Sequence, residues 1–178
     1  IVIGDDFLKR NLIVQSIKFD SLKRVGNCFM FSNKGLRSIV LPSLCYTGKC
    51  FFKSDDKAIY AVFSCLRETG EYFMADARRL GMFEADNLEK TGDMFLIGNK
   101  DLDYISLPNL KETGKMFLAA NQIIVSVNLP SLAFLPKYFL RNAVGLESIT
   151  LANDCTWDAI YNKKLLELIH KKKGKTLW

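Results

Sequence analysis

Cysteine, histidine and paired carboxylates are the residues of this 178-residue chain whose types could support chemistry. There are five cysteines and one histidine, His170, which lies in a lysine-rich tail. No two cysteines form a Cys-x-x-Cys pair, so the spacing of a zinc site is missing. A nucleophile would also lack a base, because His170 lies far from the other polar clusters. The sequence therefore predicts no metal, no cofactor and no enzyme.

Adjacent carboxylates occur at Asp5–Asp6 and at Asp55–Asp56, where turns are expected. Two neighbouring acids can do acid–base work, but in a turn they are usually solvated. We interpret both pairs as turn residues. The glycines are too widely spaced to form a phosphate-binding loop.

Cys28 and Cys50 lie 22 residues apart and occupy the same place in a repeated pattern. If the pattern stacks, their backbones come within the range of a disulfide. The same place holds tyrosine or methionine elsewhere, which favours packing. An odd number of cysteines also favours free thiols, and this leaves an intracellular location open.

A 22-residue repeat organises the chain. Three features recur in phase: a glycine, an aromatic residue three positions after it, and a leucine four positions before it. The glycines are Gly4, Gly26, Gly48, Gly70, Gly92 and Gly114, with Pro136 in the seventh place; the aromatics are Phe7, Phe29, Phe51, Phe73, Phe95, Phe117 and Phe139. We call the glycine place the repeat position. A fixed period of this length indicates coils that bury their apolar faces against their neighbours.

Further apolar residues follow ten, thirteen and fifteen positions after the repeat position, as in Leu36, Ile39 and Leu41. The last two point to one face of a strand. Pro42 and its equivalents end that strand, since proline has no N–H to donate. Asparagines such as Asn33 recur at a turn, where they can bond backbone groups. Each repeat glycine is expected at a bend with positive φ or at a crowded backbone.

These residues resemble the BspA-type bacterial leucine-rich repeat family. The matching segments are Leu36–Phe51, Leu102–Phe117 and Leu146–Leu151, and the resemblance covers roughly residues 3–151. It implies a leucine-rich-repeat solenoid that acts as a binding scaffold, often as an adhesin or a secreted virulence factor. It also implies a secreted or cell-surface location, and it brings no catalytic residue to this chain.

The predicted fold is therefore a solenoid of about seven 22-residue coils over residues 1–151, within a longer protein. A parallel sheet lines its concave side, and the convex side carries short extended pieces followed by a tight helical turn. Residues 152–178 are predicted to form a helix that caps the same domain, beginning near Asp154 or Thr156. Its apolar residues are Trp157, Ile160, Tyr161, Leu165, Leu168 and Ile169. With Lys171–Lys173, the same helix could instead contact a membrane surface or a partner.

Charges on the convex side alternate in sign from coil to coil. One column reads Arg67, Glu89, Lys111. Opposite charges on neighbouring strands stabilise a sheet slightly, so this pattern indicates scaffold. It argues against nucleic acid as a partner, which needs a stripe of one sign. No apolar run reaches the ~18 residues of a membrane span.

The concave sheet has polar ends and an apolar middle. Its outward positions there form a predicted protein-binding patch: Val40, Ile59, Tyr60, Val62, Met82, Tyr104 and Val125. Exposed patches of this kind mark interaction sites, although valine, isoleucine and tyrosine also suit any strand. We expect a non-enzymatic protein–protein interaction module that binds no cofactor. The alternative is a module that targets substrates to a larger enzyme or effector.

Overall fold

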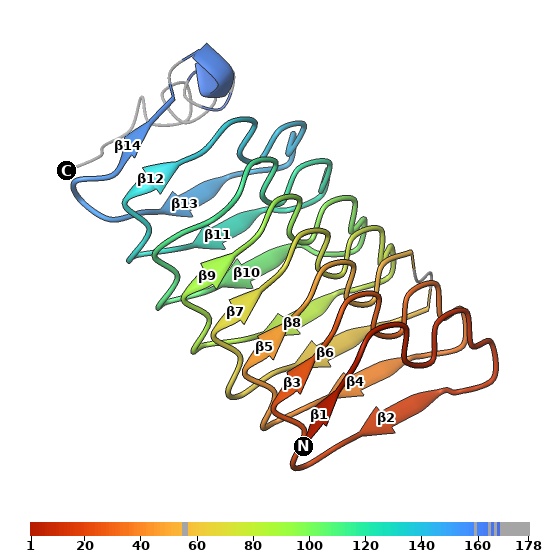
Figure 1. Cartoon of the computed structure of the whole chain (residues 1–178). Coiled ribbons are helices and arrows are strands. Elements are labelled where there is room, and N and C mark those ends of the chain that lie inside the picture. Colours follow the sequence, from red (N-terminus) through yellow and green to blue (C-terminus); the bar gives the residue numbers. More distant parts are fainter. Residues whose placement is uncertain (55–56, 159, 164, 166, 168–178) are drawn as a thin grey trace.

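The computed structural model describes residues 1–54, 57–158, 160–163, 165 and 167, and these form a parallel β-solenoid of about seven turns with almost no helix. Successive coils stack along one axis, with the N-terminus at one end and the last strands at the other (Figure 1). We number the coils from the repeat position, so that coil 1 begins at Gly4, coil 4 at Gly70 and coil 7 at Pro136. The repeat fold expected from the 22-residue period is confirmed.

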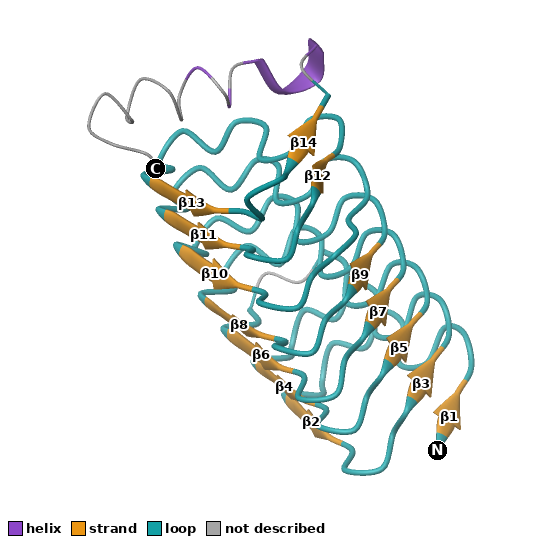
Figure 2. Cartoon of the chain, turned by 90° about the vertical axis from the view of Figure 1, so that its left-hand side faces the viewer, coloured by secondary structure: helices purple, strands orange, loops and turns teal. Residues whose placement is uncertain are grey.

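One strand per coil forms the side that we call the front sheet, and Figure 2 shows these strands in a nearly straight row. They are β2 (Ser16–Lys18), β4 (Ser38–Val40), β6 (Tyr60–Val62), β8 (Met82–Glu84), β10 (Tyr104–Ser106), β11 (Ser126–Asn128) and β13 (Ser148–Thr150). The pairing is parallel and shifted by one repeat, as in Tyr60 with Met82. The central residue of each strand points into the core, and its two neighbours point outward.

A second row of two-residue strands lies on the opposite side of the coils, and we call it the back row (Figure 2). It comprises β1 (Val2–Ile3), β3 (Arg24–Val25), β5 (Tyr46–Thr47), β7 (Glu68–Thr69), β9 (Lys90–Thr91), β12 (Phe134–Leu135) and β14 (Thr156–Trp157). These are the short extended pieces predicted for that side.

The front sheet is interrupted between coils 4 and 5. Strands β2, β4, β6 and β8 form one hydrogen-bonded ladder, and β10, β11 and β13 form another, with no pairing between β8 and β10 in the described residues. The interruption coincides with Phe83, which fills the central place of β8 where Ile105 stands in β10. The back row stays bonded at the same level, since Lys90 of β9 bridges to Glu112 in the next coil.

The repeat glycines are required because adjacent coils touch there. A Cβ on Gly48 or Gly70 would lie 2.6 Å from backbone atoms of the preceding coil, whereas one on Gly4, at the solenoid end, would meet nothing within 4 Å. Each glycine from coil 2 to coil 6 also donates its N–H to a carbonyl 23 residues earlier in the chain, as Gly70 does to the carbonyl of Thr47 (3.0 Å). Of the two predicted reasons for these glycines, crowding is therefore the correct one.

Pro136 stands at the repeat position of coil 7 and cannot donate this bond. The back row is interrupted at the same level: β1 to β9 form one ladder, extended to Glu112 by a bridge from Lys90, and β12 pairs, among the described residues, only with β14. A proline in place of the glycine thus marks the interruption of the back row.

After each repeat position the chain forms a ribbon of turns, not the tight helical turn that we predicted. Positive φ angles recur two, four and six residues after the repeat position, for example at Tyr72 (57°), Met74 (46°) and Asp76 (58°). Each of these residues donates its N–H to a neighbouring coil: Tyr72 to Asp93 above, and Met74 to Phe51 below. Bonds between coils stabilise a conformation that a non-glycine residue otherwise avoids.

Stacked phenylalanines form the centre of the core. Rings three residues after each repeat position lie nearly parallel from Phe7 to Phe139; Phe95 and Phe117, for instance, have centroids 5.3 Å apart and planes 5° apart. Both are fully buried, as predicted. Ala61 and Phe63 lie beneath Phe83 and Ala85, so small and large residues interdigitate between coils.

Buried asparagines close the turn ribbon. Asn121 donates from Nδ2 to the carbonyls of Leu96 and Leu118, both at 2.9 Å, and Asn99 bonds those of Met74 and Leu96. These carbonyls belong to positive-φ residues, so the asparagines hold the repeated bend as expected.

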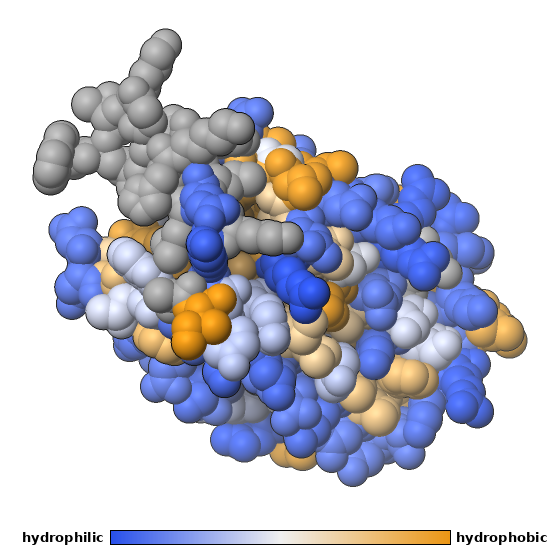
Figure 3. All heavy atoms as spheres, turned by 90° about the horizontal axis from the view of Figure 1, so that it is seen from above, coloured by the Kyte–Doolittle hydropathy of each residue, from blue (hydrophilic) through white to orange (hydrophobic). Residues whose placement is uncertain are grey.

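At the C-terminal end, the structure differs from the prediction at the start of the expected helix. Thr156 and Trp157 lie in β14, where Phe134 and Leu135 are their partners, so neither begins or lines a helix. Helical residues start by Ile160, which is exposed like Tyr161. Leu168, Ile169, His170 and Lys171–Lys173 lie outside the described residues. Viewed from this end, hydrophilic residues predominate among those described (Figure 3).

Candidate functional site

Within the described part of the chain, the reactive side chains do not converge on a site. All five cysteines are free thiols, which fits the packing interpretation of Cys28 and Cys50. Burial, and secondarily the neighbouring Cys50, raises the pKa of the Cys28 thiol, so Cys28 stays protonated at neutral pH. Among the described residues, no three cysteine, histidine or acidic side chains are grouped to hold a metal ion.

The predicted turn carboxylates have structural partners. Asp5 accepts a hydrogen bond from the backbone N–H of Asn27 on the next coil (2.7 Å), and Asp6 pairs with Lys9 (2.8 Å). Asp55 and Asp56 lie outside the described residues. Asp5 therefore links two coils, and Asp6 forms a surface ion pair.

The predicted patch is brought together on the outward face of the front sheet. Tyr60, Met82 and Tyr104 occupy the same place in consecutive coils, and their exposed fractions are 40%, 52% and 53%. Ile59 and Val125 are exposed directly before β6 and β11, whereas Val40 and Val62 are half-buried at the ends of β4 and β6. All seven residues thus reach one surface, which spans coils 2 to 6.

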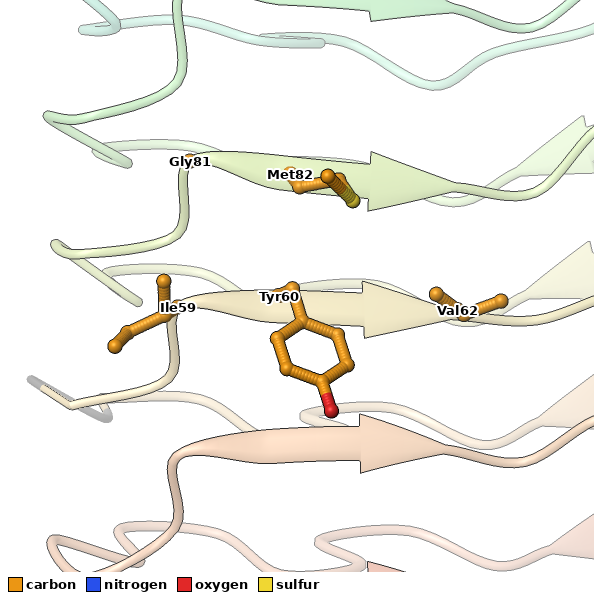
Figure 4. A pocket seen from close by; sticks show the side chains of 5 residues that line it. All are labelled: Ile59, Tyr60, Val62, Gly81 and Met82. Carbon is orange, nitrogen blue, oxygen red and sulfur yellow. The ribbon is translucent and has the colours of Figure 1, made fainter.

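A hollow of about 550 Å³ lies within this patch. It is lined by Ile59, Tyr60, Val62, Gly81 and Met82. Figure 4 shows why it is open: the Tyr60 ring extends toward the neighbouring strand and away from Met82, and Gly81 puts no side chain beside Ile59. The lining is almost wholly apolar, which suits an apolar side chain of a partner.

Gly81 is not required by the backbone, in contrast to the repeat glycines. Its φ is not positive, and an added Cβ would meet only the carbonyl oxygen of Asp101, at an ordinary 3.7 Å. The missing side chain leaves room at this place on the surface, and the backbone does not require it to be missing. Sequence reasoning placed Gly81 on this face but did not include it in the patch; its signal was a glycine at an outward position held by larger residues in every other coil.

Two opposite charges flank the hollow along the solenoid. Arg37 stands one coil before Ile59, and Asp103 stands one coil beyond Gly81, in the same column of the front sheet. Both are exposed, and neither side chain makes an ion pair or hydrogen bond within the described part of the chain. The apolar surface thus has one basic and one acidic end.

Charges on the opposite side of the coils are paired, as the alternating pattern predicted. Glu89 accepts from both Arg67 (2.6 Å) and Lys111 (3.2 Å), and Lys90 pairs with Glu112 (2.6 Å). Lys111, and then Arg67, hold the pKa of Glu89 below its ordinary value, while Glu112 raises that of Lys90. These exposed pairs link neighbouring coils, and each contributes little to stability because it lies in water.

Comparison of the chain with models of protein families, with curated proteins and with solved structures finds no match. Within the described residues, no helix is both long and apolar enough to cross a membrane.

Proposed function

We propose that this protein is a non-enzymatic protein-interaction module that binds its partner on the front sheet. The observation that carries the proposal is the hollow around Gly81, set in a continuous exposed apolar surface. Exposed apolar patches on a rigid scaffold mark interaction sites, and tyrosine and methionine are enriched at the centres of such sites.

We propose further that the solenoid is a leucine-rich repeat of the BspA type and belongs to a larger secreted or surface bacterial protein. The spacing of its leucines and phenylalanines supports this, because every leucine from Leu22 to Leu132 at the repeated place is buried. A front sheet facing a partner is the usual way in which stacked repeats bind.

Tyr60 and Tyr104 are the expected anchors. They lie two coils apart, so roughly 9–10 Å separates their backbones, with Met82 between them. Replacing either tyrosine with alanine should weaken partner binding about 30-fold or more, since a central aromatic anchor typically contributes ~2 kcal/mol. Folding should be nearly unaffected, because both side chains point outward. Titration of the partner, with circular dichroism as a folding check, measures both effects.

The partner can be found by placing a photo-crosslinking residue at Met82 in the full-length protein. A matched position on the opposite side is Lys90, and the double variant Lys90→Ala/Glu112→Ala is the matched control for the tyrosine changes. We expect adducts from position 82 that disappear with Tyr60→Ala, and unchanged binding in the control. Equal adducts from both positions would place the binding face elsewhere.

We also propose that the residues after Leu151 cap the C-terminal end of the core. Asn162 is buried and donates to the carbonyls of Leu135 (3.3 Å) and Pro136 (3.0 Å), and Leu165 joins the hydrophobic core. Tyr161 packs edge-on against Tyr138, with ring centroids 5.1 Å apart. These contacts cover the last coil, whereas Trp157 and Ile160 take no part in them.

Removal of residues 155–178 should therefore destabilise the chain and promote aggregation. The deletion takes away β14 and the bonds from Asn162, and it exposes the strand edge of β12 and the core beneath Leu165. Thermal melts and light scattering measure the two effects. A truncated chain that stays monomeric with an unchanged melting temperature would assign the tail to a membrane or a partner.

A further inference from the structure

We infer that the partner of this face is a second copy of the chain. The two copies pack front sheet against front sheet, and their solenoid axes run antiparallel. The inference rests on the proposed binding role of the front sheet. It comes from three matches between the lower and upper halves of that sheet: one of shape, one of side-chain chemistry and one of charge.

The shape match is between Ile59 and Gly81. The two residues directly precede β6 and β8, in coils 3 and 4, and one has a half-exposed branched side chain where the other has none. A two-fold axis parallel to the strands and midway between β6 and β8 places coil 3 of one copy opposite coil 4 of the other. Ile59 of each copy then enters the space above Gly81 of its partner.

The same axis brings Tyr60 opposite Met82, because these two residues pair in register on neighbouring strands. A methionine sulfur against an aromatic ring is a favourable contact. The hollow between them is filled from both sides, and the two-fold repeats the contact, so four exposed apolar side chains are covered at once.

The charge match is between Arg37 and Asp103. Coil 2 faces coil 5 across this axis, and both residues stand eleven positions after their repeat positions. Within one chain they lie three coils apart, roughly 14 Å along the solenoid, and cannot meet. In the antiparallel dimer each pairs with its opposite on the other copy, and the two-fold forms the ion pair twice.

The contact is small, and this fixes the expected strength. Six facing coils about 4.8 Å apart and four residues wide cover roughly 400 Å² on each copy. Interfaces of that size are weak, so the dissociation constant should be on the order of 100 µM. Glu84, opposite Val62 at the edge of the contact, keeps its solvent and adds no affinity.

Charge reversal tests the register. Sedimentation equilibrium of the full chain between about 10 µM and 1 mM should show a monomer–dimer equilibrium. Arg37→Asp and Asp103→Arg should each weaken it at least about 10-fold, since like charges then face each other. Mixing the two single variants should restore association, because both facing pairs become complementary in the mixed dimer. The double variant should also dimerise, and Lys90→Glu on the opposite side should behave like the unmodified chain.

Gly81→Leu is a second, uncharged test: it fills the space that Ile59 needs and should abolish the dimer while leaving the fold intact. A chain that stays monomeric at 1 mM, or single variants whose mixture does not associate, would overturn the inference. If binding of a crosslinked partner still depends on Tyr60 in that case, the front sheet remains a protein-binding face and only the second copy is excluded.

Discussion

Phe95→Ala should lower the free energy of unfolding by about 3–5 kcal/mol, the cost of truncating a fully buried phenylalanine. The ring lies between Phe73 and Phe117 in the central stack, at centroid distances of 5.4 and 5.3 Å, and Phe83 packs edge-on against it. Its loss weakens the interfaces of coil 5 with both neighbours, and in a solenoid there are no other contacts to compensate. The melting temperature should fall by roughly 6–20 °C.

Phe134→Ala is the matched control, since Phe134 lies in the back row with 51% of its surface exposed. It should cost about 1 kcal/mol or less. Urea titrations of both variants and of the unmodified chain give the comparison. Equal midpoints for Phe95→Ala and the unmodified chain would show that the register of the stack is wrong.

Gly70→Ala should destabilise the protein by about 1–3 kcal/mol or more, although it adds a single methyl group. That methyl would lie 2.6 Å from the carbonyl carbon and oxygen of Gly48 and 2.7 Å from the amide nitrogen of Lys49. All three are backbone atoms, so the coils must move apart. Their separation also lengthens the bond from the Gly70 N–H to Thr47.

The same substitution at Gly81 should have the opposite sign. Its methyl has room, and replacing glycine with alanine at a compatible backbone stabilises by about 0.4–1 kcal/mol through the unfolded state. Chemical denaturation of the pair separates crowding from the general effect of losing a glycine. Two variants with the same stability would contradict the coil contact that we describe.

The stacking of the coils, the 22-residue period and the buried positions could be predicted from the sequence, because the same residue types recur at the same place in each coil. The leucines and phenylalanines fix the inward face, and the outward places of the strands follow by alternation. This is why the exposed positions of Tyr60, Met82 and Tyr104 could be identified in advance. Their role in binding remains a prediction.

The turn ribbon could not be predicted in this way. Its positive-φ places hold Cys28, Met30, Tyr72 and Met94, among others, and none of these residue types favours that conformation. The bonds between coils impose it, and such bonds appear only once the coils are stacked. The same holds for the strand at Thr156–Trp157, where pairing with β12 overrides a helical spacing.

Gly81 escaped notice for a related reason. A glycine in a strand usually suggests a crowded backbone or a bulge, and only the room around its Cα shows that neither applies. The unpaired state of Arg37 and Asp103 is likewise a property of distances between coils. In both cases the residue can be read from the sequence, but its surroundings are known only once the coils are stacked.

The interruption between β8 and β10 makes the stiffness of the rod uneven. Where the front sheet lacks hydrogen bonds, the back row keeps them. We therefore expect the solenoid to bend most easily by opening on its front side, about the contact between β9 and Glu112. Tyr60 and Met82 lie on one side of the interruption, and Tyr104 lies on the other. A partner that contacts the coils on both sides of the interruption resists this bending. Binding at the middle of the solenoid then fixes the relative direction of its two ends.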